Sequence, residues 1–426
     1  MVKSRTTCSQ ERFQREPKSI RCSGMKRITY SPELLNHLTV HPFPARMAAN
    51  IPWQILNGRR RQLRVLDPMA GSGTTLIAGR AAGHSTYGVD SDPLAVLVTR
   101  VGTADVKASR IEDRARRTLR SARRMRIAGR DAYPPKSDKE TRKFVRYWFD
   151  LEARKQLTAL SRSIEDIKDT NTRTFLWCAL SRLIITKDAG VSLARDVSHS
   201  RPHKSFTRAP FDPFDIFETA VKRVMRACLF QRIQSAPKAQ VWQGDARKLP
   251  FKSESIDLVI TSPPYLNAID YMRGHKLSLI WMGHQINSLR QIRRDSVGAE
   301  CGSGHADDEI AQIVQVMGSM NKLPERFKRM IQRYVNDMNA VMQEIARVLV
   351  QKGQAVIVMG DCTLRGIYIR NSSAIQLLAA NHALTLISER RRHIPDKHRY
   401  LPPPRRQSDQ PLGKRLRTEV VLGFRK

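Results

Sequence analysis

The segment that decides the fold is Leu63 to Thr75, LRVLDPMAGSGTT, in which a short apolar stretch runs into a turn with two glycines. The next residues, Thr74 to Ala82, have a helical pattern, and a second strand ends at Asp90 in the sequence GVDSDP. This order of strand, turn, helix and strand predicts a βαβ unit. Glycines in such a turn let the backbone approach a ligand, and a carboxylate after the second strand can accept hydrogen bonds from ribose hydroxyls.

From the residues alone, both features also have simpler explanations. Gly71 and Gly73 suit any tight turn, and Asp90 suits the N-cap of a following helix. Two kinds of nucleotide site are disfavoured, because the turn lacks the lysine of a phosphate-binding P-loop and the third glycine of a dinucleotide fingerprint. The pattern therefore favours neither a nucleoside triphosphate nor NAD.

Five more strand patterns follow, and helical stretches separate most of them. With the βαβ unit they predict an α/β fold with an open, mostly parallel sheet. The connection between the last two strands is too irregular for a crossover helix, which predicts an antiparallel hairpin at the sheet edge. The five predicted strands are Gln240 to Gln243, Ile256 to Thr261, Gln354 to Met359, Thr385 to Arg390 and Thr418 to Phe424.

The second chemical signal is Thr261 to Tyr265, TSPPY, directly after the apolar run Ile256 to Ile260. Its two prolines fix φ and remove two backbone donors, so carbonyl oxygens face the edge where open α/β sheets bind ligands. The Ser262 hydroxyl and the Pro263 carbonyl can accept hydrogen bonds from an exocyclic amine, and Tyr265 offers a ring for stacking a flipped base. A Pro-Pro turn that only ends a strand is the structural alternative.

Charge indicates the kind of partner. The 426 residues include 75 Lys and Arg against 39 Asp and Glu, a formal net charge of +36. Such an excess repels itself in a compact chain unless a polyanion offsets it, which makes nucleic acid the leading partner. No apolar run reaches the ~18 residues of a membrane span, and residues 1–30 are too polar for a signal peptide. We therefore expect a cytoplasmic protein, associated with the nucleoid if the source is prokaryotic.

Residues 107–235 are predicted to form a basic helical insertion between two parts of the sheet. Residues 107–147 contain 15 Lys and Arg against 5 Asp and Glu, mostly opposite an apolar stripe. A solvated helix face explains this run as well as phosphate binding does, and the charge of the whole chain adds weight to phosphate binding. The candidate phosphate contacts are Arg116, Arg117, Arg123 and Arg124. The predicted apolar stripes are Ile111, Ala115, Leu119 and Ala122 on one helix and Phe144, Trp148 and Leu151 on another.

A polar, basic stretch near the end of the insertion is another candidate for phosphate contact. It runs from Arg195 to Lys204, RDVSHSRPHK, and its candidate contacts are Arg201, His203 and Lys204. Its two histidines have no acidic partner at metal-ligand spacing, so we predict no metal site. A purely structural loop is the alternative. Arg273 follows the TSPPY turn closely enough to contact the backbone of a substrate.

Taken in order, these motifs resemble those of the DNA amino-methyltransferases, which use S-adenosylmethionine. Asp67 to Thr74 looks like motif I of that family, and TSPPY looks like its motif IV. His41 to Arg46, HPFPAR, is similar to the Pro-rich segment that precedes motif I and covers the methionine end of the cofactor. The resemblance spans residues 35–105, 238–285 and 335–425. It implies a Rossmann-like methyltransferase sheet, S-adenosylmethionine as cofactor and DNA as partner.

Carried over residue by residue, the resemblance implies two sets of site residues. Asp90 would hold the ribose, and Asp245, in Gly244-Asp245-Ala246, would lie near the adenine. The insertion departs from the family pattern because it separates motif II from motif III, which leaves the element that recognises the target sequence open. The implied catalytic residues are Ser262, Pro263, Pro264 and Tyr265, and the implied cofactor residues are His41, Pro42, Pro44, Asp67, Pro68, Gly71, Gly73, Thr74, Asp90 and Asp245.

In this family the SPPY form goes mostly with cytosine N4 and the DPPY form with adenine N6, so the resemblance implies N4-methylcytosine as product. No covalent intermediate is needed, because acceptors for both amine protons direct the nitrogen lone pair toward the sulfonium methyl group. None of the six cysteines follows a proline, so the Pro-Cys nucleophile of C5-cytosine methyltransferases is missing. We expect these cysteines to be reduced and mostly buried, since no CxxC pair is present.

Other functions stay open at this point. They are an adenine-N6 DNA methyltransferase, an RNA guanine-N2 methyltransferase and a nucleic-acid-binding protein with an inactive methyltransferase fold. RNA enzymes of this kind often carry an RNA-binding domain before the catalytic half, for which the segment before His41 is short. Intact Gly71, Gly73, Asp90 and Ser262 disfavour an inactive fold. The recognition sequence, a cognate restriction endonuclease in a restriction-modification system and the oligomeric state are also open.

The predicted organisation has four parts. A basic arm spans residues 1–28, where Met25 is a second candidate start, and residues 29–106 form the cofactor half of the methyltransferase domain. The insertion covers 107–235, and residues 236–426 form the catalytic half. That half ends in a basic segment, since residues 390–426 contain 12 Lys and Arg against 3 Asp and Glu.

Overall fold

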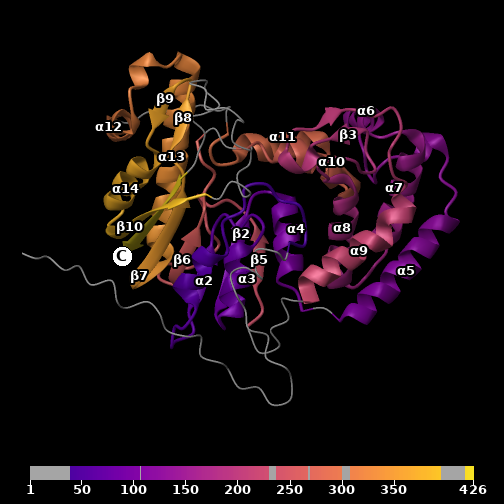
Figure 1. Ribbon diagram of the computed structural model, residues 1–426, viewed down its shortest axis with the longest axis horizontal. Helices are drawn as coiled ribbons and strands as arrows, with labels where there is room; N and C mark the ends of the chain where they lie inside the picture. The colour runs from indigo at the N-terminus through magenta and orange to yellow at the C-terminus, as the bar shows by residue number, and fades with distance from the viewer. Residues whose placement is uncertain (1–38, 106, 230–236, 267–268, 300–307, 395–417) are drawn as a thin grey trace, which may run out of the picture.

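At the centre of the protein is a seven-stranded sheet with helices on both faces (Figure 1). The structure is a computed structural model that describes residues 39–105, 107–229, 237–266, 269–299, 308–394 and 418–426, so the predicted arm at 1–28 lies outside it. The strands follow one another across the sheet in the order β10-β11-β7-β6-β1-β2-β5. They are β1 (Arg64–Asp67), β2 (Ser85–Asp90), β5 (Gln240–Gln243), β6 (Ile256–Thr261), β7 (Leu349–Met359), β10 (Thr385–His393) and β11 (Thr418–Arg425).

The predicted topology of the sheet is confirmed. Strands β7, β6, β1, β2 and β5 run parallel, whereas β11 pairs antiparallel with both β7 and β10. The antiparallel hairpin at the edge is therefore present, with the last strand of the chain lying inside the sheet between β7 and β10. Because the carboxyl ends of parallel strands share one edge, Asp67, Asp90 and Thr261 all end their strands at that edge.

Helices cover the two faces according to the alternation of side chains along each strand. Val65 packs in a cluster with Leu56 of the first described helix, whereas its neighbour Leu66 packs in a cluster with Ile345 on the other face. Helices α2, α3 and α4 cover the first face, and α13 and α14 cover the second. Their bounds are α2 (Asn50–Leu56), α3 (Thr74–Ala81), α4 (Pro93–Gly102), α13 (Glu325–Val348) and α14 (Asn371–Asn381).

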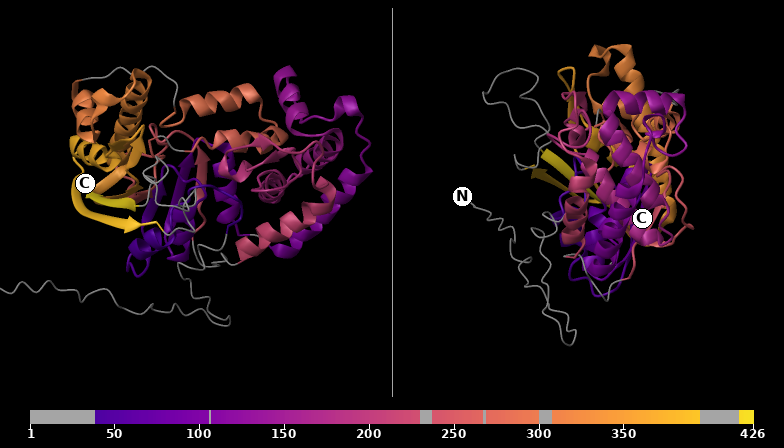
Figure 2. Two further views of the ribbon diagram at one scale, coloured as in Figure 1. Left: turned by 45° about the horizontal axis from the view of Figure 1, so that its top comes forward. Right: turned by 90° about the vertical axis from the view of Figure 1, so that its right-hand side faces the viewer.

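The insertion lies beyond α4, at the opposite end of the molecule from α13 and α14 (Figures 1 and 2). It consists mainly of helices, as predicted, and also contains a small two-stranded sheet. The predicted stripe on its first helix is confirmed, since Ile111, Ala115, Leu119 and Ala122 are all buried. The elements are α5 (Ala108–Arg124), η1 (Gly129–Asp131), α6 (Lys139–Trp148), α7 (Leu151–Glu165), α8 (Thr170–Ile184), β3 (Ala194–Arg195), η2 (Val197–His199), β4 (His203–Lys204) and α9 (Pro213–Leu229).

The second predicted stripe is only partly present, because Phe144 and Trp148 pack against the core whereas Leu151 does not belong to their helix. Helix α6 ends at Trp148, and Asp150 starts α7 as an N-cap whose side chain accepts a hydrogen bond from the backbone of Ala153. Phe144 and Trp148 are therefore only half-buried, and Leu151 begins another helix with 42% of its surface exposed. The cap breaks the helical period that the sequence pattern implied across residue 149.

The elements after β6 connect the sheet to the insertion and to its far edge. Helix α10 (Met272–Leu279) directly follows the TSPPY segment and contacts α4, α8 and η2. It leads through η3 (Ile280–Met282) into α11 (Ile286–Asp295). The remaining elements are α12 (Asp308–Met317), η4 (Met320–Lys322) and the hairpin of β8 (Cys362–Leu364) and β9 (Ile367–Ile369).

Candidate active site

The turn after β1 has the shape that its two glycines allow. Gly71 and Gly73 adopt φ values of +51° and +81°, in the left-handed region that favours glycine. A Cβ atom at Gly73 would lie 3.0 Å from Oγ1 of Thr99, and that hydroxyl donates a 3.0 Å hydrogen bond to the carbonyl of Gly71. Helix α4 thus holds the loop in place, and the close approach of Thr99 leaves no room for a side chain at Gly73. Thr74 begins α3 directly behind the loop.

Asp67 joins this glycine loop to the TSPPY turn. Its Oδ1 accepts hydrogen bonds from Oγ1 of Thr261, at 2.7 Å, and from the backbone N–H of Met69, at 3.1 Å. The side chain is only 2% exposed, and burial raises its pKa to about 6. Pro68 beside it is buried as well. Since Thr261 precedes Ser262, one buried hydrogen bond sets the distance between the two loops.

Asp90 lies beside the glycine loop, as predicted. Its Oδ2 accepts a 2.7 Å hydrogen bond from the backbone N–H of Gly71, and its Oδ1 accepts one of 2.9 Å from the backbone N–H of Asp92. Burial, and then the nearby carboxylate of Asp92, raise the pKa of Asp90 to about 7. The carboxylate therefore fixes the loop and keeps lone pairs on both oxygens for a ligand.

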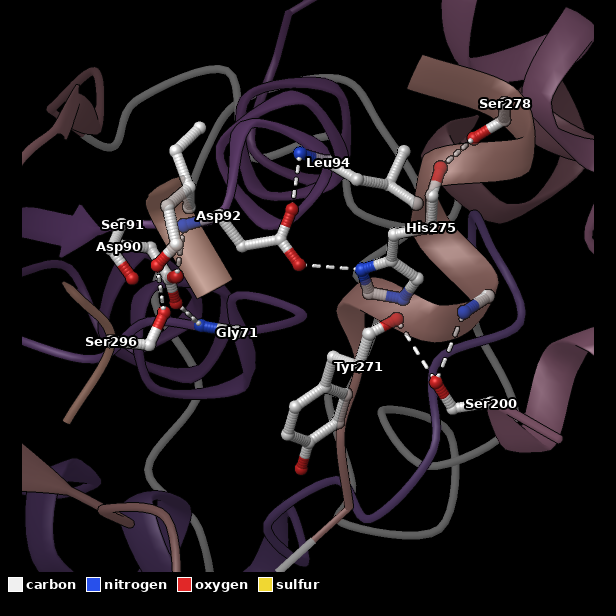
Figure 3. A network of polar contacts seen from close by, with 12 residues as sticks. Gly71, Asp90, Ser91, Asp92, Leu94, Ser200, Tyr271, His275, Ser278 and Ser296 are labelled. Atoms are coloured by element: carbon white, nitrogen blue, oxygen red, sulfur yellow. Dashed lines mark hydrogen bonds and ion pairs between the residues drawn. The ribbon is translucent and has the colours of Figure 1, made fainter. Parts of the chain in front are cut away.

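A pair of buried side chains links this region to α10 (Figure 3). Asp92 is the N-cap of α4, where its Oδ1 accepts from the backbone of Leu94 at 2.8 Å. Its Oδ2 accepts from Nδ1 of His275 at 2.5 Å, and His275 is 1% exposed. Burial would raise the pKa of Asp92, but the charge and the hydrogen bond of His275 hold it below its ordinary value. This contact thus joins the end of β2 to the helix after the TSPPY turn.

The Pro-rich segment folds over the glycine loop. The ring of Phe43 stacks on Tyr271, with 5.4 Å between centroids, and lies 5.3 Å from the ring of His275. His41 is buried, and burial and the charge of Arg182 lower its pKa to about 3, so it is neutral. Its Nδ1 donates to the carbonyl of Pro42 at 2.8 Å, and its Nε2 accepts from Oγ of Ser181 at 2.8 Å.

A pocket lies between this segment and the glycine loop, where the sequence placed the methionine end of a cofactor. His41 and Thr74 line it, whereas Pro42 is half-buried and Pro44 buried beside it. The residues that line the pocket are Thr39, Val40, His41, Arg46, Ala49, Ser72, Thr74, Ile77 and Val98.

The TSPPY turn leaves the sheet at the same edge. Pro263 is buried, whereas Ser262, Pro264 and Tyr265 are half-buried. The hydroxyl of Tyr265 donates to Oε1 of Glu419, on β11, over 3.4 Å. Burial and the Glu419 carboxylate raise the pKa of Tyr265 well above its ordinary value, while a hydrogen bond with Ser262 acts in the opposite direction. The phenol therefore stays protonated and its ring has a fixed position.

Asp245 follows β5 at this edge but has a partner that the sequence did not reveal. Its Oδ2 accepts a 2.7 Å hydrogen bond from Arg247, which also donates to Oδ1 and reaches Oδ1 of Asp337 at 2.5 Å. The backbone N–H of Gly244 donates to the carbonyl of Asp90 at 2.9 Å, which keeps the loop beside β2. Asp245 thus lies beside Asp90 with its charge already compensated.

The predicted nucleic-acid contacts divide into two groups. Arg116, Arg117, Arg123 and Arg124 are exposed on α5, at the outer side of the insertion, where Arg123 pairs with Asp215 at 3.2 Å. By contrast, the exposed Arg201, His203 and Lys204 lie on or beside β4, and the loop before them contacts α10. Arg273 is exposed on α10 and pairs with Asp270 at 3.1 Å. Of these two groups, only the second lies next to α10, the helix that follows the TSPPY turn.

Two pairings of the site were not predictable from the sequence. Asp92 and His275 are 183 residues apart, and Tyr265 and Glu419 are 154 apart, so no local pattern joins them. The sequence offered two signals for the first pair. His275 follows the TSPPY turn, and Asp92 precedes Pro93, which begins a helix. The stacking role of Phe43 could have been suspected from its place in HPFPAR.

Other kinds of site find little support in the described part of the chain. Cys178 and Cys228 are buried free thiols, as expected, and burial raises the pKa of Cys178 to about 12. Cys8, Cys22 and Cys301 lie outside the described residues. Within the described ranges, no cluster of three or more His, Cys, Asp or Glu could hold a metal ion, and no helix there is long and apolar enough to cross a bilayer.

The parts of this edge fit S-adenosylmethionine. The glycine loop follows the first strand of the sheet with two positive φ values, Asp90 keeps carboxylate lone pairs beside it, and the pocket below the Pro-rich segment borders the loop at Ser72 and Thr74. The strand order and this edge define the class as the Rossmann-like methyltransferases, and S-adenosylmethionine is the cofactor of this chain.

Comparison with known proteins narrows the class. The type II methyltransferase M.MvaI of Kocuria varians is 23% identical over 392 residues, which cover 84% of this chain and 84% of that protein. The type II methyltransferase M.AvaI of Nostoc sp. (strain PCC 7120) is 25% identical over 348 residues, or 70% of this chain and 68% of that protein. No protein-family model matches the sequence. The chain is therefore similar to type II methyltransferases over 70% or more of its length.

Solved structures align only loosely. A methyltransferase of Methanosarcina mazei that depends on S-adenosylmethionine gives a TM-score of 0.32 at 9% identity, over 88% of this chain and 96% of that chain. A Thermus thermophilus protein described as a DNA modification methylase gives 0.21 at 18% identity, over 43% and 50%. The assignment of the fold rests on the order of the strands in the sheet.

Proposed function

We propose that this protein is a site-specific DNA methyltransferase that transfers a methyl group from S-adenosylmethionine to an exocyclic amine of a base, with cytosine N4 as the favoured target. The observation that carries the proposal is the buried hydrogen bond between Asp67 and Thr261. It joins the loop that suits the cofactor to the turn that suits the amine. The two type II methyltransferases with similar sequences support DNA as the substrate.

The cofactor would be held by three strand ends and the Pro-rich segment. We assign its ribose to Asp90, its adenine to the neighbourhood of Asp245, and its methionine end to the pocket that His41 and Thr74 line. When bound, S-adenosylmethionine supplies an electrophilic methyl group on a sulfonium. Gly71 and Gly73 permit the close approach of the backbone, while the enclosed prolines keep water out. The prolines in question are Pro42, Pro44 and Pro68.

The base would be held at the TSPPY turn. The Ser262 hydroxyl and the Pro263 carbonyl accept the two amine protons, which favours sp³ character and directs the lone pair toward the methyl group. The ring of Tyr265, fixed through Glu419, stacks on the base. After the nitrogen has formed its new bond it carries a positive charge and readily loses a proton to water, so no general base is required.

Cytosine N4 is favoured over adenine N6 because the turn begins with a neutral serine where the adenine form has an aspartate. This preference rests on family resemblance. Adenine-N6 methylation, and guanine-N2 methylation of RNA, use the same turn chemistry and are the alternatives. A cognate restriction endonuclease would complete a restriction-modification system, and a cytoplasmic location would follow from that role.

Nucleoside mass spectrometry of DNA from cells that express the protein tests the proposal. The expected product is N4-methylcytosine, absent from cells that express Ser262→Ala. N6-methyladenine as the only product would refute the cytosine assignment and leave the mechanism standing. 5-Methylcytosine would overturn both, because that reaction uses a cysteine nucleophile that follows a proline, and none of the six cysteines follows a proline. Methylated RNA with unmodified DNA would favour the RNA alternative.

A further inference from the structure

The loop between β3 and β4 is fastened to the helix that follows the TSPPY turn. Oγ of Ser200 accepts a 3.1 Å hydrogen bond from the backbone N–H of Gly274, and Ser200 donates to the carbonyl of Tyr271 at 3.0 Å (Figure 3). A Cβ atom at Gly274 would lie only 2.5 Å from the carbonyl oxygen of Val197. The loop therefore rests directly on the first turn of α10.

The rest of the hairpin is held equally firmly by the insertion. The backbone N–H groups of Asp196 and Ser198 donate to the carbonyls of Lys187 and Thr186, at 2.7 and 2.9 Å. Asp196 and Ser200 both adopt left-handed backbone conformations, with φ near 56° and 55°, which non-glycine residues hold only where their surroundings fix them. The hairpin is thus held in a defined position relative to the insertion and to α10.

Its outer side combines cations and aromatic rings. Lys204 is exposed, and its ammonium group lies 5.0 Å from the ring centroid of Tyr147, a tyrosine that is 54% exposed. Another aromatic residue of α6, Phe144, lies 5.3 Å from the ammonium group of Lys276 on α10. His203 is exposed next to Lys204. A surface of this composition suits a nucleic-acid strand, since cations meet phosphates and rings stack on bases.

We propose that the β3–β4 hairpin, together with Tyr147, contacts the bases beside the target base and so determines the recognition sequence. The inference rests on the proposed function and assigns its specificity. A two-stranded ribbon is narrow enough for the major groove, and His203 and Lys204 present donors that can pair with base edges there. A rigid attachment to α10 keeps these contacts in register with the TSPPY turn. Helix α5 has charge but lies on the outer side of the insertion, away from α10.

Two single variants at exposed positions test this inference, with a matched control on α5. His203→Ala and Tyr147→Ala are compared with Arg117→Ala, which removes an exposed side chain of the insertion far from α10. The measured quantity is kcat/KM on a duplex with the site that the wild type methylates, divided by kcat/KM on duplexes with one base pair beside the target changed. The ratio is expected to fall about 10-fold when a base contact is lost, and to stay constant for Arg117→Ala.

Three results would overturn the inference. An unchanged ratio in both hairpin variants would do so, even if log K against log salt became flatter by about 0.9 per lost cation, because the hairpin would then contact phosphates alone. A fall in the ratio for Arg117→Ala alone would move specificity to α5. A wild-type protein that methylates no DNA would remove the proposed function as well. Calorimetry with S-adenosylmethionine checks that each variant is folded, and His203→Asn replaces His203→Ala if the latter fails.

Discussion

Two loops at the same edge of the sheet differ in composition and in the contacts that they make. The loop after β1 contains two glycines with positive φ. Two carboxylates hold it in place: Asp90 accepts a hydrogen bond from the backbone of the loop, and Asp67 accepts one from Thr261. The turn after β6 consists of prolines, one hydroxyl and one aromatic ring, with Ser262 and Tyr265 as its chemical groups. The loop after β1 has many fixed contacts and suits binding of the cofactor. The turn after β6 offers only a few polar atoms to the target base. We therefore expect substitutions in the first to change cofactor affinity and substitutions in the second to change rate.

The largest effect is expected from Ser262→Ala. Losing one aligned polar group in the transition state should lower the single-turnover rate of methyl transfer by about 10- to 1000-fold. Cofactor affinity, measured by calorimetry, should stay within error. Ser288→Ala, at an exposed serine of α11, is the control. An equal loss of cofactor affinity in Ser262→Ala would mean that the two loops do not act separately.

Asp90→Ala should instead lower cofactor affinity and change the rate of methyl transfer much less. It removes the acceptor assigned to the ribose, and with it a charge-assisted hydrogen bond that contributes about 1.5–3 kcal/mol to binding. Calorimetry should show the weaker affinity, while the single-turnover rate at saturating cofactor should change much less. Unchanged affinity would show that the cofactor binds elsewhere along the edge.

The pKa of Asp90 adds a dependence on pH. Only the carboxylate form can accept from both ribose hydroxyls, and the pKa of Asp90 in the free protein is about 7. Lowering the pH from 8 to 6 should therefore weaken cofactor binding about tenfold, because the group is mostly protonated at pH 6. Asp67 and Asp92 face the same region, so Asp90→Asn is the control, and its affinity should vary much less. A wild-type affinity that rises on acidification would contradict the assignment.

The same raised pKa has a separate effect on stability. A carboxylate with a pKa above its unfolded value of 3.8 binds more protons in the folded state between the two values. The free protein therefore gains stability from Asp90 as the pH falls through 7, in contrast to its loss of cofactor affinity.

The smallest effect is expected from the arginines of α5. Each exposed guanidinium that contacts a phosphate should contribute about 0.9 to the slope of log K against log salt. Replacing Arg116, Arg117, Arg123 and Arg124 by glutamine should flatten that slope and leave the methylated positions unaltered. Filter binding over a range of salt concentrations measures the slope. An unchanged slope would identify α5 as a solvated face.

The sequence predicted the sheet and the two loops because their signals are local. Glycines, prolines and strand-ending acids lie within a few residues of one another, and their backbone preferences determine the turns. The contacts that join the loops were not predictable in the same way. Asp67 and Thr261 are 194 residues apart, and their hydrogen bond depends on β1 and β6 being neighbours.

Two further differences have equally physical causes. The resemblance placed Asp245 near the adenine but gave no sign that a guanidinium only two residues away, that of Arg247, binds it. Phe144, Trp148 and Leu151 were expected on one helix face, but α6 ends at Trp148 and the Asp150 cap starts a new helix at Leu151. In both cases one nearby polar side chain, Arg247 or Asp150, made a contact that the sequence pattern did not indicate.

The place of β1 in the middle of the sheet has a consequence for the growing chain. Strand β1 pairs with β2 soon after both are made, but its other edge waits for β6, whose Thr261 lies 194 residues beyond Asp67. At about 5–20 residues per second, a ribosome needs roughly 10–40 s to cover that distance. During this interval Val65 and Leu66 present an apolar strand edge of the kind that aggregates. Synthesis of this protein therefore includes a period in which one edge of β1 has no strand partner.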